Sequence, residues 1–311
     1  MKEWMSEKAM QIFGTEYALQ SVKRLLGGAQ KHTYLAKCVN GFQFVLYQWD
    51  KSTTCFENDD ENQWFSSNSA ALFQNNNEWM RKHGILTPKL FYMDRSRSDC
   101  DYEYAFVEYI EGRDMDYIME KEPERQQAVL ESLKESIGRL HSIKSEAAGQ
   151  IGRLQGPDFD ILAFALEDMH KNVQYLQKED KDYAYAYARV EEKAREYADR
   201  LEKRNTYTFI HGELGPNHVM VDGDNHAYLI DIEGARYDDV EEECSFLDMR
   251  FHSMLGKPED TLDEHRMHFY HIGHCLGNLC GAVQLRQKGY YDMDDVNGMI
   301  DFFHAQIAAI I

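Results

Sequence analysis

The sequence predicts an α+β fold with two lobes, in which a small antiparallel sheet precedes a larger, mainly helical part. Strand-like runs and glycine-containing turns alternate over residues 22–47, whereas patterns of helical spacing dominate from residue 123 onward. The chain has 311 residues, which is enough to bury a large core, and 43% of them are hydrophobic. We place the lobe boundary so that residues 1–110 and 111–311 form the two lobes.

The first lobe is expected to open with a short amphipathic helix over residues 3–13 and three strands. Paired glycines, Gly27 and Gly28, lie in the turn between the first two strands. Asn40-Gly41 marks a second tight turn, because this dipeptide favours the two-residue loops of hairpins. Residues 42–47 then form the third strand.

A polar segment over residues 50–77 is expected to contain a loop and to lead into a helix that ends near Gly84. Strand-like runs follow at residues 87–93 and 102–110. These runs complete the sheet of the first lobe.

The second lobe is expected to be mainly helical. Pro123 suits the first turn of a helix, where a missing backbone N–H costs nothing. Further patterns of helical character cover residues 160–203, 240–255, 262–287 and 293–311.

Two apolar runs within the second lobe each end at an ionisable residue. Residues 206–210 lead into His211, and residues 227–230 lead into Asp231. A short strand between them closes on a turn at residues 222–225, whose aspartates, glycine and asparagine are typical turn formers. Because several reactive groups fall within about two dozen residues, we interpret this stretch as a functional site.

Charge and composition exclude several classes of protein. The chain carries 34 Lys+Arg and 54 Asp+Glu, so its formal net charge is −20. We therefore expect no nucleic-acid partner, because phosphate backbones require a basic surface. The charge is compatible with attraction of a cationic small molecule, but acidic surfaces are more often explained simply by solubility. No apolar run approaches the length of a membrane span, so no membrane partner is expected. Six dispersed cysteines and the absence of a signal-like N-terminus predict a cytoplasmic protein.

In order and spacing, these features resemble the aminoglycoside phosphotransferase and choline kinase-like branch of the protein-kinase fold. His211-Gly212-Glu213-Leu214-Gly215-Pro216 is similar to the catalytic loop H-G-D-x-x-x-x-N of that family, and Leu229-Ile230-Asp231-Ile232-Glu233-Gly234 is similar to its metal-binding segment. Supporting matches are Gly27-Gly28, the hinge-like Phe106-Val107-Glu108-Tyr109-Ile110, and Gly138-Arg139-Leu140-His141-Ser142.

The resemblance implies a phosphotransferase that uses Mg²⁺ with ATP or GTP and acts on a small-molecule hydroxyl, in particular that of an aminosugar, aminoglycoside or amino alcohol. It places Glu213 in the position of the catalytic carboxylate and Asp231 in that of the main metal ligand, with Glu233 as a second acid. His211 is expected to brace the catalytic loop through hydrogen bonds.

The resemblance also implies the nucleotide contacts. Gly27 and Gly28 fall in the nucleotide loop, Tyr47 on the third strand, and Glu108 and Ile110 at the hinge.

Four departures from the family pattern concern the catalytic and phosphate-binding groups. Glu213 replaces an aspartate, and His218 stands where a metal-ligating asparagine is usual, with Asn217 one position earlier. Tyr47 replaces the third-strand lysine that meets the phosphates. The helix glutamate that pairs with this lysine corresponds by spacing to Gln74, and this register is open. The alternatives for the missing acid are Glu78 and Glu61, and those for the missing cation are Lys31 and Lys51.

These departures motivate a second hypothesis, namely a catalytically weak or inactive kinase-like protein with a binding or regulatory function. We favour the phosphotransferase, because both key positions remain carboxylates.

Glu241-Glu242-Glu243 has two interpretations, a solvated helix start or an acid that stabilises the catalytic loop. A zinc site is the least favoured hypothesis, because its ligands cannot all converge on one helix. Its candidate ligands are His265, His268, His271, His274, Cys275 and Cys280.

Overall fold

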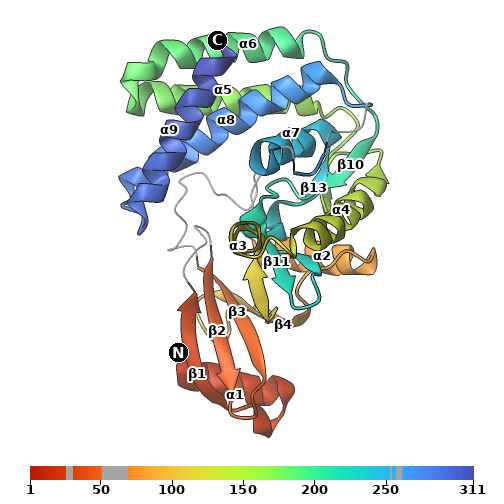
Figure 1. Ribbon diagram of the computed structural model, residues 1–311, viewed down its shortest axis with the longest axis vertical. Helices are drawn as coiled ribbons and strands as arrows, with labels where there is room; N and C mark the ends of the chain where they lie inside the picture. The colour runs from red at the N-terminus through yellow and green to blue at the C-terminus, as the bar shows by residue number, and fades with distance from the viewer. Residues whose placement is uncertain (26–30, 51–68, 253, 257–260) are drawn as a thin grey trace. The chain divides into compact units, whose positions relative to one another are not determined.

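The computed structural model describes residues 1–25, 31–50, 69–252, 254–256 and 261–311. The chain divides into two compact units, and each contains two separate segments of the sequence (Figure 1). The first unit comprises Met1–Leu140 and Pro216–Ala235, and the second comprises His141–Gly215 and Arg236–Ile311. The lobe boundary at residue 110 stays a prediction.

The first unit is built on a five-stranded antiparallel sheet with the order β1-β2-β3-β5-β4. Its strands are β1 Leu19–Leu25, β2 His32–Cys38, β3 Gln43–Trp49, β4 Leu90–Asp94 and β5 Glu103–Glu108. Helix α1, Lys2–Phe13, packs on this sheet and is followed by the 3₁₀ turn Thr15–Tyr17. These elements confirm the helix and the strands that the sequence predicts for the first part of the chain.

Aromatic side chains form much of the core between α1 and this sheet. The rings of Phe44 and Phe106 stack with centroids 4.6 Å apart, and Trp4 meets Tyr104 edge to face at 4.9 Å. Such pairs stabilise a core by about 0.5–1.5 kcal/mol beyond the apolar area that they bury.

Helix α2 and a second, smaller sheet complete the first unit. Helix α2, Ala70–Lys82, is capped by Ser69, whose hydroxyl accepts the backbone N–H of Leu72. The smaller sheet has the order β12-β11-β6. Gly112 in β6 is required here, because a Cβ at this position would lie 1.7 Å from the carbonyl oxygen of Val221. The bounds are β6 Gly112–Asp114, β11 Val219–Asp222, β12 Ala227–Leu229, α3 Met115–Lys121 and α4 Gln126–Ser142.

In its described residues, the second unit combines a sheet of short strands with five helices. The sheet has the order β7-β10-β13-β8-β9. Its strands are β7 Lys144–Ser145, β8 Gly149–Gln150, β9 Arg153–Leu154, β10 Tyr207–Ile210 and β13 Arg236–Asp238. The helices are α5 Ile161–Glu179, α6 Ala184–Ala198, α7 Val240–Phe251, α8 Glu264–Gln287 and α9 Met293–Ile310, with a 3₁₀ turn at Lys181–Tyr183. Helix α8 packs against each of the other four helices, α5, α6, α7 and α9.

The structure corrects two details of the prediction. Pro123 lies in the turn before α4 and not in its first helical turn, and the unpredicted helix α3 precedes it. Strands β10 and β12, which contain the two apolar runs before His211 and Asp231, belong to different sheets. Among the described residues, no helix is long and apolar enough to cross a membrane.

Candidate functional site

Asp231 lies at the end of the β11–β12 hairpin in a left-handed backbone conformation. Its φ and ψ are 59° and 47°, a region in which a non-glycine residue costs roughly 1–3 kcal/mol. The hairpin fixes the chain before it, since the Ile230 N–H donates to the His218 carbonyl at 3.0 Å. The 3₁₀ turn Ile232–Gly234 fixes the chain after it. Backbone strain that is held from both sides is characteristic of functional sites.

Lys31, at the entry to β2, forms ion pairs with both carboxylates of this segment. Its Nζ lies 2.7 Å from Asp231 Oδ1 and 2.5 Å from Glu233 Oε1. Burial disfavours the ammonium, but the two carboxylates outweigh burial and raise the pKa of Lys31 well above its usual value. Burial also raises the pKa of Glu233, which Lys31 opposes. We name Lys31, Asp231 and Glu233 the lysine–carboxylate cluster.

Tyr47 lies beneath the ammonium of this cluster. Lys31 Nζ is 5.0 Å from the centroid of the Tyr47 ring, which is a cation–π distance. Burial raises the pKa of Tyr47 to about 12, so its hydroxyl stays protonated at neutral pH. Tyr47 meets Phe73 of α2 edge to face at 5.3 Å, whereas the Gln74 amide donates to Glu78. The structure therefore places Phe73, and not Gln74, against Tyr47.

Asn76 links helix α2 to the turn that follows Asp231, a role that the sequence did not predict. Its buried Nδ2 lies 2.7 Å from the carbonyl oxygen of Ile232, 3.3 Å from that of Glu233 and 3.1 Å from that of Ala235. Neutral hydrogen bonds thus hold α2 against this turn. The available signal was a run of three asparagines, 75–77, inside a helix, where asparagine is unfavourable unless its side chain has a specific partner.

His218 approaches the lysine–carboxylate cluster from the turn Pro216–His218. Its Nε2 lies 3.4 Å from Asp231 Oδ2, whereas Asn217 is exposed. One oxygen of Glu233, Oε2, is buried without a hydrogen-bond partner. Carboxylate oxygens are the ligands that Mg²⁺ prefers, and an imidazole suits transition metals. The carboxylates of Asp231 and Glu233 could therefore contribute to a cation site, and an orphaned buried oxygen fits this role. The ligand atoms of Asp231, Glu233 and His218 do not all lie within 4.8 Å of one another, so one shared cation would require these side chains to shift.

The catalytic-loop candidates belong to the second unit, directly after β10. His211 is fully buried, and its Nδ1 lies 3.4 Å from the backbone nitrogen of Glu213, whose own side chain is exposed. The backbone N–H of Gly212 donates to Glu243 Oε2 at 2.7 Å. These contacts favour a bracing role for His211 and leave the Glu213 carboxylate accessible.

Glu243 belongs to a group of buried charges on β13 and α7. Arg236 Nε donates to Asp238 at 2.7 Å, and its Nη2 donates to Glu242 at 2.6 Å. Burial raises the pKa of Asp238 to about 7 and that of Glu243 to about 7. The interpretation of Glu241-Glu242-Glu243 as a solvated helix start is therefore wrong, because all three residues are buried.

The comparison with protein families decides the affiliation of the chain. Residues 31–256 match the profile of the phosphotransferase enzyme family. The chain belongs to this family. No curated protein matches the sequence.

Solved structures of kinase-like phosphotransferases have the same fold. Choline kinase LicA from Streptococcus pneumoniae gives a TM-score of 0.67 at 18% identity, over 99% of this chain and 99% of that chain. A thermostable mutant of aminoglycoside phosphotransferase APH(4)-Ia gives 0.66 at 12% identity, over 100% and 98%. Its D198A form, a ternary complex with ADP and hygromycin B, gives 0.65 at 13% identity, over 98% and 97%. The α+β, protein-kinase-like fold is confirmed.

The nucleotide contacts implied by membership of the phosphotransferase family are only partly described. Gly27 and Gly28 lie outside the described residues. At the hinge, the Glu108 N–H donates to the Lys89 carbonyl at 2.8 Å, and the Glu108 carboxylate accepts the Lys89 N–H at 2.9 Å. Ile110 is buried. The nucleotide-binding roles of these residues stay predictions.

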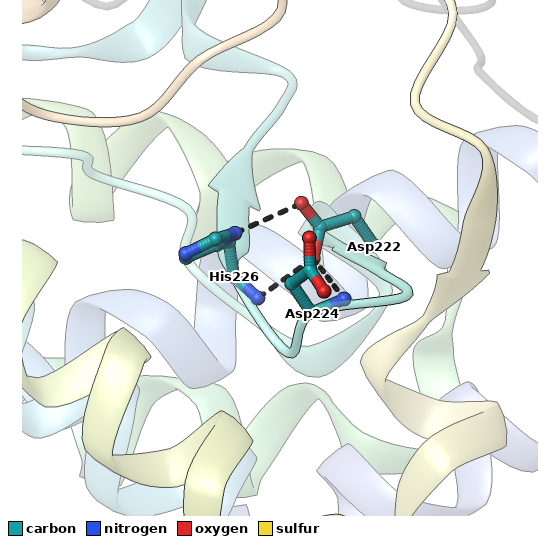
Figure 2. Close-up of side chains that lie close together, drawn as sticks. All are labelled: Asp222, Asp224 and His226. Carbon is teal, nitrogen blue, oxygen red and sulfur yellow. Dashed lines mark hydrogen bonds and ion pairs between the residues drawn. The ribbon is translucent and has the colours of Figure 1, made fainter.

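A separate group of acidic residues and a histidine lies on the β11–β12 turn (Figure 2). Asp222 Oδ1 accepts the backbone N–H groups of Asp224 and His226, each at 2.9 Å. The His226 ring lies 3.0 Å from Asp222 Oδ2. These hydrogen bonds close the predicted turn, so we assign the group a structural role.

The histidines of α8 make separate contacts. His274 Nε2 lies 2.9 Å from the Glu242 carbonyl oxygen, and His268 stacks on Tyr197. In the part of the chain that the structure describes, the Asp222 turn brings three potential ligand atoms within 4.8 Å of one another, and α8 carries no such group.

Proposed function

We propose that this protein transfers the γ-phosphoryl group of ATP or GTP to a hydroxyl group of a small molecule, with Mg²⁺ as the cofactor. The observation that carries the proposal is the lysine–carboxylate cluster, in which Lys31, Asp231 and Glu233 concentrate charge within the family-matched part of the chain. Phosphoryl transfer requires this kind of charge neutralisation and positioning more than covalent chemistry.

Asp231 and Glu233 are proposed to bind the metal ion through their carboxylate oxygens, with His218 or Asn217 as a further ligand. The buried, unpartnered Oε2 of Glu233 supports this assignment, as does the 3.4 Å approach of His218 to Asp231. A metal–nucleotide complex would supply the phosphoryl group and neutralise its charge. The hairpin and the contacts of Asn76 keep the two carboxylates in place.

Glu213 is proposed as the general base that accepts the proton of the acceptor hydroxyl. It has the charge of the family's aspartate on a side chain that is one methylene longer. Its exposure supports the role, since a base must reach the substrate. The buried partners of the loop, His211 and Glu243, would limit the motion of its backbone.

The acceptor is proposed to be cationic, in the class of aminosugars, aminoglycosides or amino alcohols. The net charge of −20 supports this class, because an acidic protein attracts cationic ligands. The neighbours also support it, since one is a choline kinase and another was crystallised with hygromycin B.

The test is turnover of ATP and of GTP against a library of hydroxyl compounds, with Glu213 variants. Glu213→Gln is expected to lower kcat by roughly 10²- to 10⁴-fold, the usual contribution of a general base. Glu213→Asp restores the family residue and should retain most of the activity. Glu131→Gln, on the exposed face of α4, is the matched control. Unchanged activity in Glu213→Gln would remove Glu213 from the base role, and absence of turnover with every acceptor would contradict the proposed activity.

A second candidate is a kinase-like binding or regulatory protein. The observation that favours it is the neutral Tyr47 at the position of the phosphate-binding lysine. Calorimetry with Mg²⁺ and ATP or GTP separates the two functions. Absence of any nucleotide binding, together with absence of turnover, would favour the regulatory function.

A further inference from the structure

Strand β3 carries Tyr47 where the family pattern has a lysine, yet an ammonium group lies directly over this position. It comes from Lys31, whose Nζ is 5.0 Å from the Tyr47 ring centroid. In the first unit it is placed between Asp231 and Glu233, which are the proposed metal ligands.

Strand register explains how the residue directly before β2 reaches this place. Tyr47 pairs with Thr33 across the antiparallel β2–β3 ladder. Side chains two residues apart in an extended chain lie on the same face, so Lys31, which precedes β2, is directed to the face that Thr33 and Tyr47 share. Lys31 is then the diagonal neighbour of Tyr47, close enough for a long side chain to cross. Lys31, directly before β2, can thus place an ammonium group close to the position that a lysine of β3 has in the family pattern.

The cluster has a charge imbalance that matters for ligand binding. Two carboxylates face one ammonium, and Lys31 and Glu233 are both almost fully buried. Burying charges costs several kcal/mol per ion unless partners compensate. Asp231 is more exposed, with 33% of its side chain accessible. An incoming cation could therefore reach the Asp231 carboxylate, which is one of the two that Lys31 contacts.

We propose that Lys31 is the phosphate-binding cation of this protein and that it also occupies the carboxylates when no metal ion is bound. This inference rests on the proposed function. Before nucleotide binding, Lys31 neutralises Asp231 and Glu233. On binding, Lys31 exchanges carboxylate contacts for oxygens of the triphosphate. Lys31 and a divalent cation thus compete for the carboxylates when nucleotide is absent and act together when it is present.

The competition predicts opposite effects of one substitution on two ligands. Lys31→Met keeps the length and the apolar stem but removes the charge. Its affinity for ATP with Mg²⁺ should fall by about 10- to 100-fold, the loss expected for a hydrogen bond to a charged group. Its affinity for Mn²⁺ alone should rise, because the competing ammonium is gone. Isothermal titration calorimetry measures both constants, and the spin resonance of free Mn²⁺ measures the second independently.

Three variants sharpen the test. Lys37→Met removes an exposed lysine of β2 and should change neither affinity. Lys31→Met/Tyr47→Lys returns a cation to β3 and should recover part of the ATP affinity. If Lys31→Met does not fold, Lys31→Arg takes its place, because it keeps the positive charge. Its larger planar head should weaken ATP binding less than Lys31→Met would, and its charge should keep Mn²⁺ binding weak.

The outcomes separate this inference from the proposed function. Suppose that the wild-type protein binds ATP and that Lys31→Met has the same affinities as wild type for ATP and for Mn²⁺. This result overturns the role of Lys31 and leaves the proposed function standing. Wild-type protein that binds no ATP or GTP overturns the phosphate role together with the proposed function. Opposite shifts of the two affinities in Lys31→Met support the inference.

Discussion

Two regions of the molecule bury carboxylates beside cations, and they do so with different cations. In the first unit, Lys31 holds Asp231 and Glu233. In the second unit, Arg236 holds Asp238 and Glu242. A lysine ammonium is a compact point charge on a flexible stem, whereas the arginine guanidinium is a rigid fork that remains charged. The first arrangement suits exchange with a ligand, and the second suits a permanent brace.

In accessibility, the two groups differ at Asp231. Its side chain is 33% exposed, whereas the side chains of the other members of both groups are at most 10% exposed. The arginine pairs lie next to Glu243, which accepts the backbone N–H of Gly212. We therefore interpret the arginine pairs as support for the catalytic loop, and the lysine–carboxylate cluster as the part that meets ligands.

The largest expected effect comes from removing the brace. Arg236→Met leaves Asp238 and Glu242 buried without their cation and should lower the free energy of unfolding by about 3–5 kcal/mol. Urea denaturation followed by circular dichroism measures the loss. Arg195→Met is the control, because Arg195 is 53% exposed beside Glu191 and such surface pairs contribute at most about 1 kcal/mol. Equal losses in the two variants would contradict the distinction between brace and surface pair.

The pH dependence of stability should report on Glu243. Its pKa is about 7 against an ordinary value of 4.5, because burial and the nearby Glu242 disfavour the charged form, while the N–H groups of Gly212 and His211 and the charge of Arg236 oppose them. A carboxyl whose folded-state pKa is raised contributes stability that is complete below about pH 4.5 and lost as the pH rises through about 7.

Glu243→Gln should remove this loss, because the amide stays neutral and its oxygen still accepts the Gly212 N–H. Relative to wild type, the variant should be equally stable near pH 4.5 and more stable by up to about 3 kcal/mol near pH 8, the equivalent of two to three pKa units. Thermal or urea unfolding across this range checks the trend. A difference that does not change with pH would show that Glu243 does not titrate there.

Local patterns predicted much of the fold, because helices and hairpins are encoded by neighbouring residues. Helix α1, strands β1 to β3 and the turn at 222–225 follow from apolar spacing and turn residues. The two- or three-residue strands β6 to β9 were missed, since so short a run has no periodicity. The separation of β10 and β12 into two sheets was missed for another reason, namely that pairing partners lie far apart in the chain.

The candidate site shows the same limit. The segment containing Asp231 and Glu233 was recognisable as a motif, and Lys31 was one of two candidate cations. Choosing Lys31 required knowing that it shares a sheet face with Tyr47 and that this face meets Asp231. The role of Asn76 was missed because its partners are backbone carbonyls that lie 156, 157 and 159 residues away in the chain. A backbone carbonyl is present in every residue, so such a contact leaves no signal in the sequence.

The smallest expected effect concerns metal preference at the lysine–carboxylate cluster. His218 brings an imidazole nitrogen to within 3.4 Å of Asp231, in the position where the family resemblance implies an asparagine. Imidazole suits transition metals, whereas a carboxamide oxygen suits Mg²⁺. His218→Asn should therefore lower the ratio of Mn²⁺-supported to Mg²⁺-supported phosphoryl transfer several-fold. Nucleotide-free Mn²⁺ binding should weaken in parallel.

His226→Asn is the matched control, because His226 lies on the exposed turn beside Asp222 and not beside Asp231. It should change neither the metal ratio nor Mn²⁺ binding. If His218→Asn leaves both quantities unchanged as well, His218 is not a ligand, and its contact with Asp231 serves only to hold the carboxylate. In that case the two units differ less than their cations indicate, since the His218 contact would hold the Asp231 carboxylate in place just as Arg236 holds that of Asp238.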